Sequence, residues 1–338
     1  MGHQFSIKQI AAQAGVSTAT VDRVLNGRTG VKNQTVSQVR YAISELEAQS
    51  AQLYMAGRKL MIDVVMDAPE RFSTAVRQAL ESELPRLEPA VIRARFDLHE
   101  KWQPYACAEA LERIRRRGSH GVILKAADDE VVGEAVSALR ADGIPVVTLV
   151  TDLPLSERIA YVGLNNRAAG STAAYLLSSW LHRAEDSIMV IVSNDSFRGE
   201  EEREMGFRTT IRHLAPDRNI HYISQSDGLD GTTEHLVLEL LNRDPTVTGV
   251  YSIGGGNKGV ISAYRQAGKV PVAFIGHDLV PENVQLLKQG NLNAVIHHDL
   301  RTDMHTCCIA LMQFHGLVQG HVRLGSSKIE VITPYSLP

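Results

Sequence analysis

The sequence has few cysteines and no apolar run long enough to cross a membrane. Its three cysteines, Cys107, Cys307 and Cys308, have neither paired spacing nor a histidine cluster in metal-ligand register. We therefore expect reduced thiols in a core, with no disulfide and no metal. A membrane-spanning helix needs about 18 consecutive apolar residues, and a secretory signal needs an apolar stretch near its start. Because the sequence shows neither, we expect a cytoplasmic protein with no membrane partner.

The sequence also lacks the residue clusters on which enzymes depend. A nucleophile with its base, or a set of metal ligands, would have to converge at neighbouring strand ends. One tempting group is His297-His298-Asp299, but adjacent residues of a strand point to opposite faces of the sheet. The glycine run at residues 254–259, GGGNKG, lacks the Gly-Lys-Ser/Thr ending of a phosphate-binding loop. We therefore expect neither an enzyme nor a bound cofactor.

Length and composition predict a large globular protein with more than one domain. The chain has 338 residues, whereas a single domain takes about 150. Hydrophobic residues make up 44% of the chain and charged residues 22%. These fractions are ordinary for globular proteins and allow a sizeable core.

Residues 5–46 predict three short helices with tight joints. Ser6 and Ser17 are suited to cap the first two helices, and Gly15 tolerates the positive φ that the turn between them needs. Apolar residues recur every three or four positions in each segment: Ile7, Ile10 and Ala11, then Val21, Val24 and Leu25, then Val36, Val39, Ile43 and Leu46. Two helices joined by a short turn containing Gly form a helix-turn-helix, whose second helix enters the DNA major groove.

The N-terminal segment is basic, whereas the rest of the chain is acidic. Residues 1–59 contain seven Lys or Arg and three Asp or Glu, a net charge of +4. Because the whole chain carries −3, residues 60–338 sum to −7. A basic head on an acidic body favours a phosphate-binding module attached to a second function.

Residues 15–27, GVSTATVDRVLNG, resemble the DNA-binding signature of the lactose/galactose repressor family of bacterial transcriptional regulators. Helix spacing, cap, turn glycine and the terminal Asn-Gly all agree with that signature. The resemblance implies that Thr18, Ala19 and Arg23 read base edges. Arg23 is suited to a bidentate pair with guanine, whereas the short Thr18 and Ala19 suit thymine methyl groups. A three-helix oligomerisation cap is the alternative.

The remaining expected DNA contacts set the register of the head or bend the duplex. Thr20, Lys32, Asn33 and Thr35 are suited to phosphates. Met55 lies where the family usually has the Leu of a hinge helix, which inserts into the minor groove; a linker Met packed on the body is the alternative. The hinge lacks the family's usual Pro-Asn start. The full expected set is Ser17, Thr18, Ala19, Thr20, Arg23, Asn26, Lys32, Asn33, Thr35 and Met55.

Asp22 departs from the family, which usually has Ser at this position. A carboxylate is repelled by nearby phosphates. Asp22 is therefore expected either to turn toward Arg23 and orient it, or to accept a hydrogen bond from a cytosine amino group. The sequence does not decide between these alternatives.

From Leu60 onwards, short apolar runs alternate with amphipathic helical segments. This βαβαβα order begins with LMIDVVM and restarts after IAYVGLNN, which predicts an α/β body of two doubly wound parallel-sheet halves. Ligands bind such folds at the carboxyl ends of the strands. The body resembles the type I periplasmic sugar-binding proteins, which also form the body of the repressor family. The resemblance implies that the halves exchange strands, so residues 292–296 and the following helix are expected to return to the first half.

The expected organisation is a helix-turn-helix head, a hinge and an effector-binding and dimerisation domain. Their boundaries are residues 1–47, 48–59 and 60–338. Within the body, one subdomain comprises residues 60–161 with 291–318, and the other comprises residues 162–290 with 319–338.

Several side chains near strand ends are expected to contact an effector in the cleft between the halves. The resemblance implies that Arg203 grips the effector, with Arg198 as second choice, and that Asp278 accepts sugar hydroxyls. Asn194 and Asp195 end a further strand. The full expected set is Phe72, Lys125, Asp152, Arg198, Arg203, Asn257, Asp278 and His298.

Three of these positions leave alternatives open. Phe72 suits either a sugar face or core packing. Lys125 replaces the Asn of the relatives, which indicates either an effector with some negative charge or an ion pair with Asp128. His298 occupies a position where the relatives use Gln, and His297 is its competitor.

Together these patterns predict a ligand-responsive transcriptional regulator, most often a repressor, that binds palindromic operator DNA. A homodimer is expected because one helix-turn-helix buries too little surface for specific binding; a tetramer is the alternative. The effector is expected to be a sugar, polyol or sugar derivative, coupled reciprocally to operator binding through the hinge. Induction and corepression stay open. An exported sugar-binding protein of a transport system is the alternative function, which the head and the lack of a signal sequence disfavour.

Overall fold

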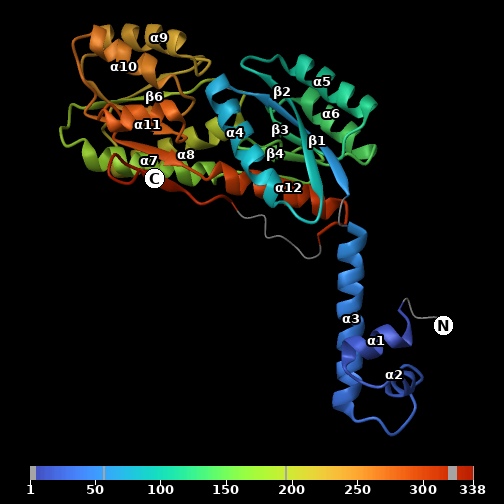
Figure 1. Ribbon diagram of the computed structural model, residues 1–338. Coiled ribbons are helices and arrows are strands. Elements are labelled where there is room, and N and C mark those ends of the chain that lie inside the picture. Colours follow the sequence, from blue (N-terminus) through green and yellow to red (C-terminus); the bar gives the residue numbers. More distant parts are fainter. Residues whose placement is uncertain (1–4, 56–57, 195, 319–325, 338) are drawn as a thin grey trace. The chain divides into compact units, whose positions relative to one another are not determined.

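The computed structural model describes residues 5–55, 58–194, 196–318 and 326–337; the side chains of residues 47–55 are not described. The chain divides into two compact units (Figure 1). One comprises residues 1–59 with 88–91, and the other comprises residues 60–87 with 92–338.

Three helices build the first unit: α1 (Ile7–Ala14), α2 (Thr18–Leu25) and α3 (Asn33–Met55). Ser6 caps α1 in a capping box with Gln9, and α1 ends at Gly15, which has a φ of 64°. Ser17 caps α2 by accepting a hydrogen bond from the backbone nitrogen of Thr20. The helices pack around a small core of Ile10, Ala11, Ala14, Val21, Val39 and Ala42. The helix-turn-helix expected from the sequence is confirmed.

The third helix is longer than the sequence pattern suggested. We expected one helix ending near Leu46 and a separate helical linker from Ala48, but α3 is continuous over 23 residues. Residues 33–55 contain neither Gly nor Pro, so the chain has no residue that would stop the helix. The boundary at residue 47 stays a prediction.

The second unit contains a first sheet of five strands in the order β2-β1-β3-β4-β5. The pairs β1–β3, β3–β4 and β4–β5 are parallel. The strands are β1 (Lys59–Asp67), β2 (Val91–His99), β3 (Val122–Lys125), β4 (Val146–Leu149) and β5 (Ala160–Val162). The intervening helices are α4 (Glu70–Glu83), a 3-10 turn (Leu84–Arg86), α5 (Pro104–Arg117) and α6 (Glu130–Ala141).

The second sheet has six strands in the order β11-β10-β9-β8-β6-β7. Its pairs are parallel except for β10 with β11, which is antiparallel. The strands are β6 (Ser187–Ile191), β7 (Ile220–Ile223), β8 (Val247–Ser252), β9 (Ala273–His277), β10 (Ala294–His297) and β11 (Glu330–Ile332). The helices are α7 (Asn166–Trp180), α8 (Arg198–Leu214), α9 (Asp230–Arg243), α10 (Asn257–Gln266) and α11 (Pro281–Lys288). Two parallel-sheet halves are therefore confirmed.

The second sheet is buried on both faces. Met189 and Ile191 of β6 belong to the core that includes side chains of α9, α10 and α11. Ile188 and Val190, which alternate with them, belong to the core that includes side chains of α7 and α8. A strand buried on both faces reads as a continuous apolar run, and this explains the sequence SIMVI.

The exchange between the halves differs from our expectation in one strand. Residues 292–296 were expected to return to the first half, but β10 pairs with β9 and β11 in the second sheet. The reason is register: Ala294 to Ile296 continue the parallel ladder beside β9. Only the next helix, α12 (Leu300–Phe314), returns, and it lies beside α4 (Figure 1). It also packs against β4 and β5.

Two other expectations concerned the three cysteines and the apolarity of the helices. Cys107, Cys307 and Cys308 are buried free thiols, and burial raises the pKa of Cys107 and Cys308 to about 12. Among the helices that the structure describes, none combines the length and the apolarity that crossing a bilayer would require.

Candidate functional site

The second helix of the head exposes the side chains that were expected to read DNA. Thr18, Ala19 and Arg23 are exposed on α2, while Val21 on its opposite face is buried in the core. Expected contacts that flank them are also exposed: Ser17, Asn26, Lys32 and Asn33. Thr20 and Thr35 are half-buried. One short helix thus exposes small side chains in its first turn and a basic side chain in its last turn.

Asp22 does not pair with Arg23, contrary to one of the two alternatives drawn from the sequence. Its Oδ1 accepts from Asn26 Nδ2 at 2.8 Å, and its Oδ2 accepts from Arg28 Nη1 at 3.1 Å. Asn26 and Arg28 follow the end of α2, and both side chains reach back to Asp22 in the last turn. Asp22 therefore stabilises the end of α2 and does not pair with Arg23.

Met55, the expected minor-groove wedge, has a side chain outside the described residues. The same holds for Asp195, which was expected to end a strand near the cleft.

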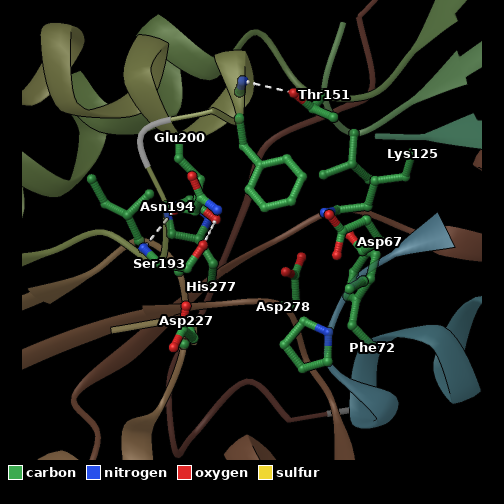
Figure 2. Close-up of a pocket in the computed structure, with 18 of the residues that line it drawn as sticks. Asp67, Phe72, Lys125, Thr151, Ser193, Asn194, Glu200, Asp227, His277 and Asp278 are labelled. Atoms are coloured by element: carbon green, nitrogen blue, oxygen red, sulfur yellow. Dashed lines mark hydrogen bonds between the residues drawn. The ribbon is translucent and has the colours of Figure 1, made fainter. Parts of the chain in front are cut away.

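A cavity of about 180 Å³ lies within the second unit and is lined by residues of both halves (Figure 2). That volume holds several water molecules rather than one, so the cavity is of a size for a small ligand. Its walls mix carboxylates, cations, amides and aromatic rings. The expected residues among the lining are Phe72, Lys125, Asn194, Arg203, Asn257 and Asp278.

Asp278 directly follows β9 and directs its carboxylate into the cavity (Figure 2). Its backbone has a φ of 65°, a strained conformation for a residue with a side chain. Burial alone would raise the pKa of this carboxyl, but the facing His298 and the charge of Arg203 hold that pKa well below its usual range. Asp278 is therefore an ionised acceptor, suited to ligand hydroxyl groups.

Lys125 ends β3 and lies beside Asp67 (Figure 2). Its Nζ donates to the backbone oxygen of Asp67 at 2.7 Å and lies 3.9 Å from the ring centroid of Phe197. Burial lowers the pKa of Lys125, and the nearby charges of Glu200 and Asp67 offset only part of that effect. The ammonium group is thus already held by protein groups, and the expected alternative of an ion pair with Asp128 is wrong because Asp128 faces Arg198 at 3.6 Å.

Arg203 reaches the cavity from α8, and a hydrogen bond to a protein group outside the cavity lining fixes its side chain. Its Nε donates to Asn166 Oδ1 at 2.8 Å, so the end of the guanidinium group is directed at the cavity that it lines. Helices α7 and α8 pack very closely here, since a Cβ on Gly206 would lie 2.1 Å from Arg167 O. That glycine, which follows Arg203 by three positions, lets α8 seat the arginine deep in the wall.

The amide and imidazole groups of the second half form a connected layer beside Asp278. Asn257 Nδ2 donates to Asn283 Oδ1 at 2.7 Å, and Asn283 Nδ2 donates to the His277 backbone oxygen at 2.8 Å. His277 Nε2 bonds the Tyr251 hydroxyl at 2.8 Å. In this layer, Asn257 Oδ1 and His277 Nδ1 are buried without a hydrogen-bond partner among the described side chains, and buried polar atoms of this kind are suited to bind a ligand or water.

Aromatic side chains of the first half complete the cavity wall. Phe72 is 7% exposed and lines the cavity from α4. Trp102 lines it from the loop after β2 and stacks on His99, with ring centroids 3.9 Å apart. Flat apolar rings beside polar groups suit the faces of a sugar ring, whose C–H groups are apolar.

Several contacts join the two halves across the mouth of the cavity. Arg71 Nη2 donates to Gly228 O at 2.7 Å, and Lys101 Nζ pairs with Asp227 Oδ2 at 2.7 Å. A Cβ on Gly255 would lie 2.0 Å from Arg71 Nη2. The glycine run was expected to let a ligand approach the backbone, and in this structure it also admits Arg71. The cleft is therefore closed.

Three expected effector residues lie outside the cavity lining. Asp152 binds Arg158 and Thr148. Arg198 pairs with Asp128 and Glu202. His298 is completely buried behind Asp278, so any effect that it has on an effector is indirect.

Sequence reasoning missed several lining residues. They are Asp67, Arg71, Trp102, Phe197, Glu200, Asp227, His277 and Asn283. Asp67 and His277 end β1 and β9, so the strand-end rule could have found them. The loop residues carried no comparable signal.

Comparison with known proteins relates each part of the chain to a family. Residues 6–47 match the family model described as bacterial regulatory proteins, lacI family, and residues 62–303 match the periplasmic binding protein domain. The HTH-type transcriptional regulator CelR of Thermobifida fusca is 25% identical over 290 residues, which cover 81% of this chain and 82% of CelR.

Two further similarities concern the body alone. The ribose import binding protein RbsB of Salmonella typhimurium is 26% identical over 186 residues, which cover 53% of this chain and 60% of RbsB; the match thus spans less than two thirds of that relative. The crystal structure of GanP, a glucose-galactose binding protein from Geobacillus stearothermophilus, superposes with a TM-score of 0.73 at 19% identity. It covers 83% of this chain and 99% of GanP.

Proposed function

Because this chain belongs to the lacI family of bacterial regulatory proteins, whose members are DNA-binding transcriptional regulators, we propose that it is an effector-controlled repressor. The observation that carries the proposal is the presence of two binding surfaces in one chain. One is the exposed helix α2, and the other is the closed cavity lined by Asp278, Arg203 and aromatic rings.

The proposed effector is an uncharged monosaccharide or polyol. Asp278 accepts hydroxyl protons, and the end of the Arg203 guanidinium donates to neighbouring oxygens. Phe72 and Trp102 cover the apolar faces of the ring. An anionic ligand is disfavoured, because the Lys125 ammonium group already donates to the Asp67 backbone oxygen and a further anion would meet the carboxylates of Asp67, Glu200 and Asp278.

The proposed DNA target is a palindromic operator bound by a homodimer. One helix α2 offers eight residues, and a single head of this kind gives limited specificity, so two heads on symmetric half-sites are needed. Arg23 is the residue assigned to a guanine, with Thr18 and Ala19 beside it.

Coupling between the two surfaces follows from linkage. If the closed cavity and the operator-competent hinge belong to different states, a ligand that favours one state weakens the other by the same factor. The mouth contacts of Arg71 and Lys101 identify the state that an effector would favour, because they form only when the two halves approach.

A thermal-shift screen of the purified chain tests the proposed function. The probes are D-ribose, D-glucose and D-galactose, chosen from what the similar proteins bind, together with a sugar acid and a sugar phosphate. A ligand present at a hundredfold excess over its Kd stabilises the native state by about 2.7 kcal/mol. We expect one of the neutral sugars to stabilise the protein and the two anionic probes to have no effect.

The matched variants are Arg203→Ala and Arg208→Ala. Both remove an arginine from α8, but the side chain of Arg208 is 43% exposed and pairs with Glu204 outside the cavity lining. Arg203→Ala should abolish the stabilisation by the sugar, whereas Arg208→Ala should keep it. Fluorescence anisotropy with a palindrome selected from random DNA then shows whether that sugar weakens or strengthens operator binding. Stabilisation by the anionic probes alone would contradict the proposed effector class.

A further inference from the structure

Behind the cavity, a buried chain of polar side chains leads away from Asp278. His298 is 0% exposed, and its Nε2 lies 3.4 Å from Asp278 Oδ1. On the other side of the ring, Nδ1 hydrogen-bonds the carboxylate of Asp303. The second oxygen of Asp303 accepts from the hydroxyl of Ser327 at 2.6 Å. We refer to Asp278, His298, Asp303 and Ser327 as the relay.

The relay lies where the chain crosses between the halves. His298 follows β10 of the second sheet and precedes α12, which packs on the first half. Ser327 donates its backbone N–H to Gly163 O at 2.8 Å, and Gly163 follows β5 at the crossing from the first half to α7. A side chain that lines the cavity is thus connected to two crossings through three buried or half-buried groups.

The charges of the relay require a proton on His298. Two carboxylates buried on either side of a neutral ring would lack a counter-charge, which is costly away from water. Burial lowers the pKa of the ring, but the neighbouring Asp278 and Asp303 outweigh it and raise that pKa to about 9. His277 does not compete for the proton, because burial and the charge of Arg203 lower its pKa well below the usual value.

We propose that Asp303 is a positioning residue of the effector cavity: it holds His298 as a cation that fixes the Asp278 carboxylate in the cavity wall. Asp303 itself is 2% exposed and does not reach the cavity, so it acts only through His298. The inference rests on the proposed function for what Asp278 is positioned to bind. The protonation of the relay, in contrast, is measurable on the protein alone.

Other ionisable groups surround the relay and must be separated from it in a titration. They are His277 on β9, His297 on β10, Asp299 at the start of α12, Arg203 on α8 and Glu330 on β11. Asp299 provides the matched control. It caps α12 by accepting from Arg301 N, and it stands four residues before Asp303 without a bond to His298.

The test is an NMR titration of the ¹⁵N-labelled full-length chain, with His298 assigned from its backbone. In the unmodified protein we expect both ring nitrogens of His298 to be protonated at pH 7 and the ring to titrate near pH 9. Asp303→Asn keeps the size of the side chain and removes its charge, so it should lower the midpoint by about 1–3 pH units. Asp299→Asn still caps the helix and should leave the midpoint in place.

A neutral His298 at pH 7 in the unmodified protein would overturn the proposal, and so would equal shifts in the two variants. If Asp303→Asn fails to fold, His298→Gln serves instead. It keeps a polar side chain without a charge, and the carboxyl of Asp278, followed by ¹³C NMR, should then titrate at a higher pH. An unchanged Asp278 titration would also count against the relay.

The effect on binding is measured with D-ribose, D-glucose and D-galactose by the same thermal-shift assay. Loss of the charge at Asp303 should weaken binding of a stabilising sugar about tenfold or more, whereas Asp299→Asn should not. If no sugar binds the unmodified protein, the proposed function fails while the NMR result on the relay still stands. If a sugar binds equally well to both variants, the relay does not position Asp278.

Discussion

The head and the cavity present their polar groups in opposite ways. Thr18, Ala19 and Arg23 are exposed side by side on a single helix. In the cavity, Arg203 and Asp278 come from different elements, and each already faces a protein partner, Asn166 and His298. This difference implies that the proposed operator binding would depend on long-range attraction and on adaptable side chains, whereas the proposed effector binding would depend on groups held in place before the ligand arrives.

Salt should separate these two modes of binding by the largest margin. When NaCl rises from about 50 to 200 mM, a dimer with six or more phosphate contacts loses operator affinity by roughly 10³-fold. Buried charges are screened much less, so the stabilisation by the sugar should change little over the same range. Fluorescence anisotropy measures the first quantity and thermal shift measures the second. Equal salt slopes would mean that the cavity wall is more accessible than its burial indicates.

Removal of the Arg23 side chain should weaken operator binding by the head and leave sugar binding in the cavity unchanged. Arg23→Ala removes the bidentate guanine contact, which is worth about 1–3 kcal/mol of discrimination, or roughly 5- to 150-fold in affinity for each half-site of the operator. Arg40→Ala is the control, because Arg40 is exposed on α3 and carries the same charge outside the recognition helix. Sugar stabilisation should be unchanged in both variants. An operator affinity equal to that of Arg40→Ala would remove Arg23 from its assigned role.

The same difference explains how much the sequence could reveal. The head follows from local rules, because the caps Ser6 and Ser17, the turn residue Gly15 and the apolar spacing all lie within one short segment. Two details differed. The third helix continues past Leu46 to Met55, and Asp22 pairs with Arg28, which lies beyond the end of α2, where the pattern gives no direction for the side chain.

The cavity was predicted only in part, because it is assembled from distant segments. Arg203, Asn257 and Asp278 line it as expected, since strand ends and helix starts of a parallel sheet meet at one edge. Trp102 and Asp227 come from loops whose course depends on packing, and β10 joined the second sheet because its register matches β9. The place of His298 depends on Asp303, a neighbour whose relevance is visible only in three dimensions.

The smallest expected effect on sugar binding concerns the mouth of the cavity, where an ion pair is partly exposed although the cavity behind it is buried. Lys101 and Asp227 join the two halves, but their side chains are 58% and 32% exposed. An exposed ion pair is worth at most about 1 kcal/mol, so Lys101→Ala should weaken sugar binding by no more than roughly fivefold.

Lys258→Ala is the matched control for that change. Lys258 is about as exposed as Lys101 and pairs with Glu282 at 3.2 Å, but both residues of this pair belong to the second half. Isothermal titration with the sugar that stabilises the protein should show a modest loss for Lys101→Ala and none for Lys258→Ala. Because the Lys101 pair joins the two halves at the edge of the cavity lining, its loss should mainly shift the population of closed protein. Equal losses of sugar affinity in both variants would mean that the effect comes from removing a positive charge anywhere on the body, and not from the Lys101 pair. A loss as large as that of Arg203→Ala would instead place Lys101 among the groups that contact the sugar.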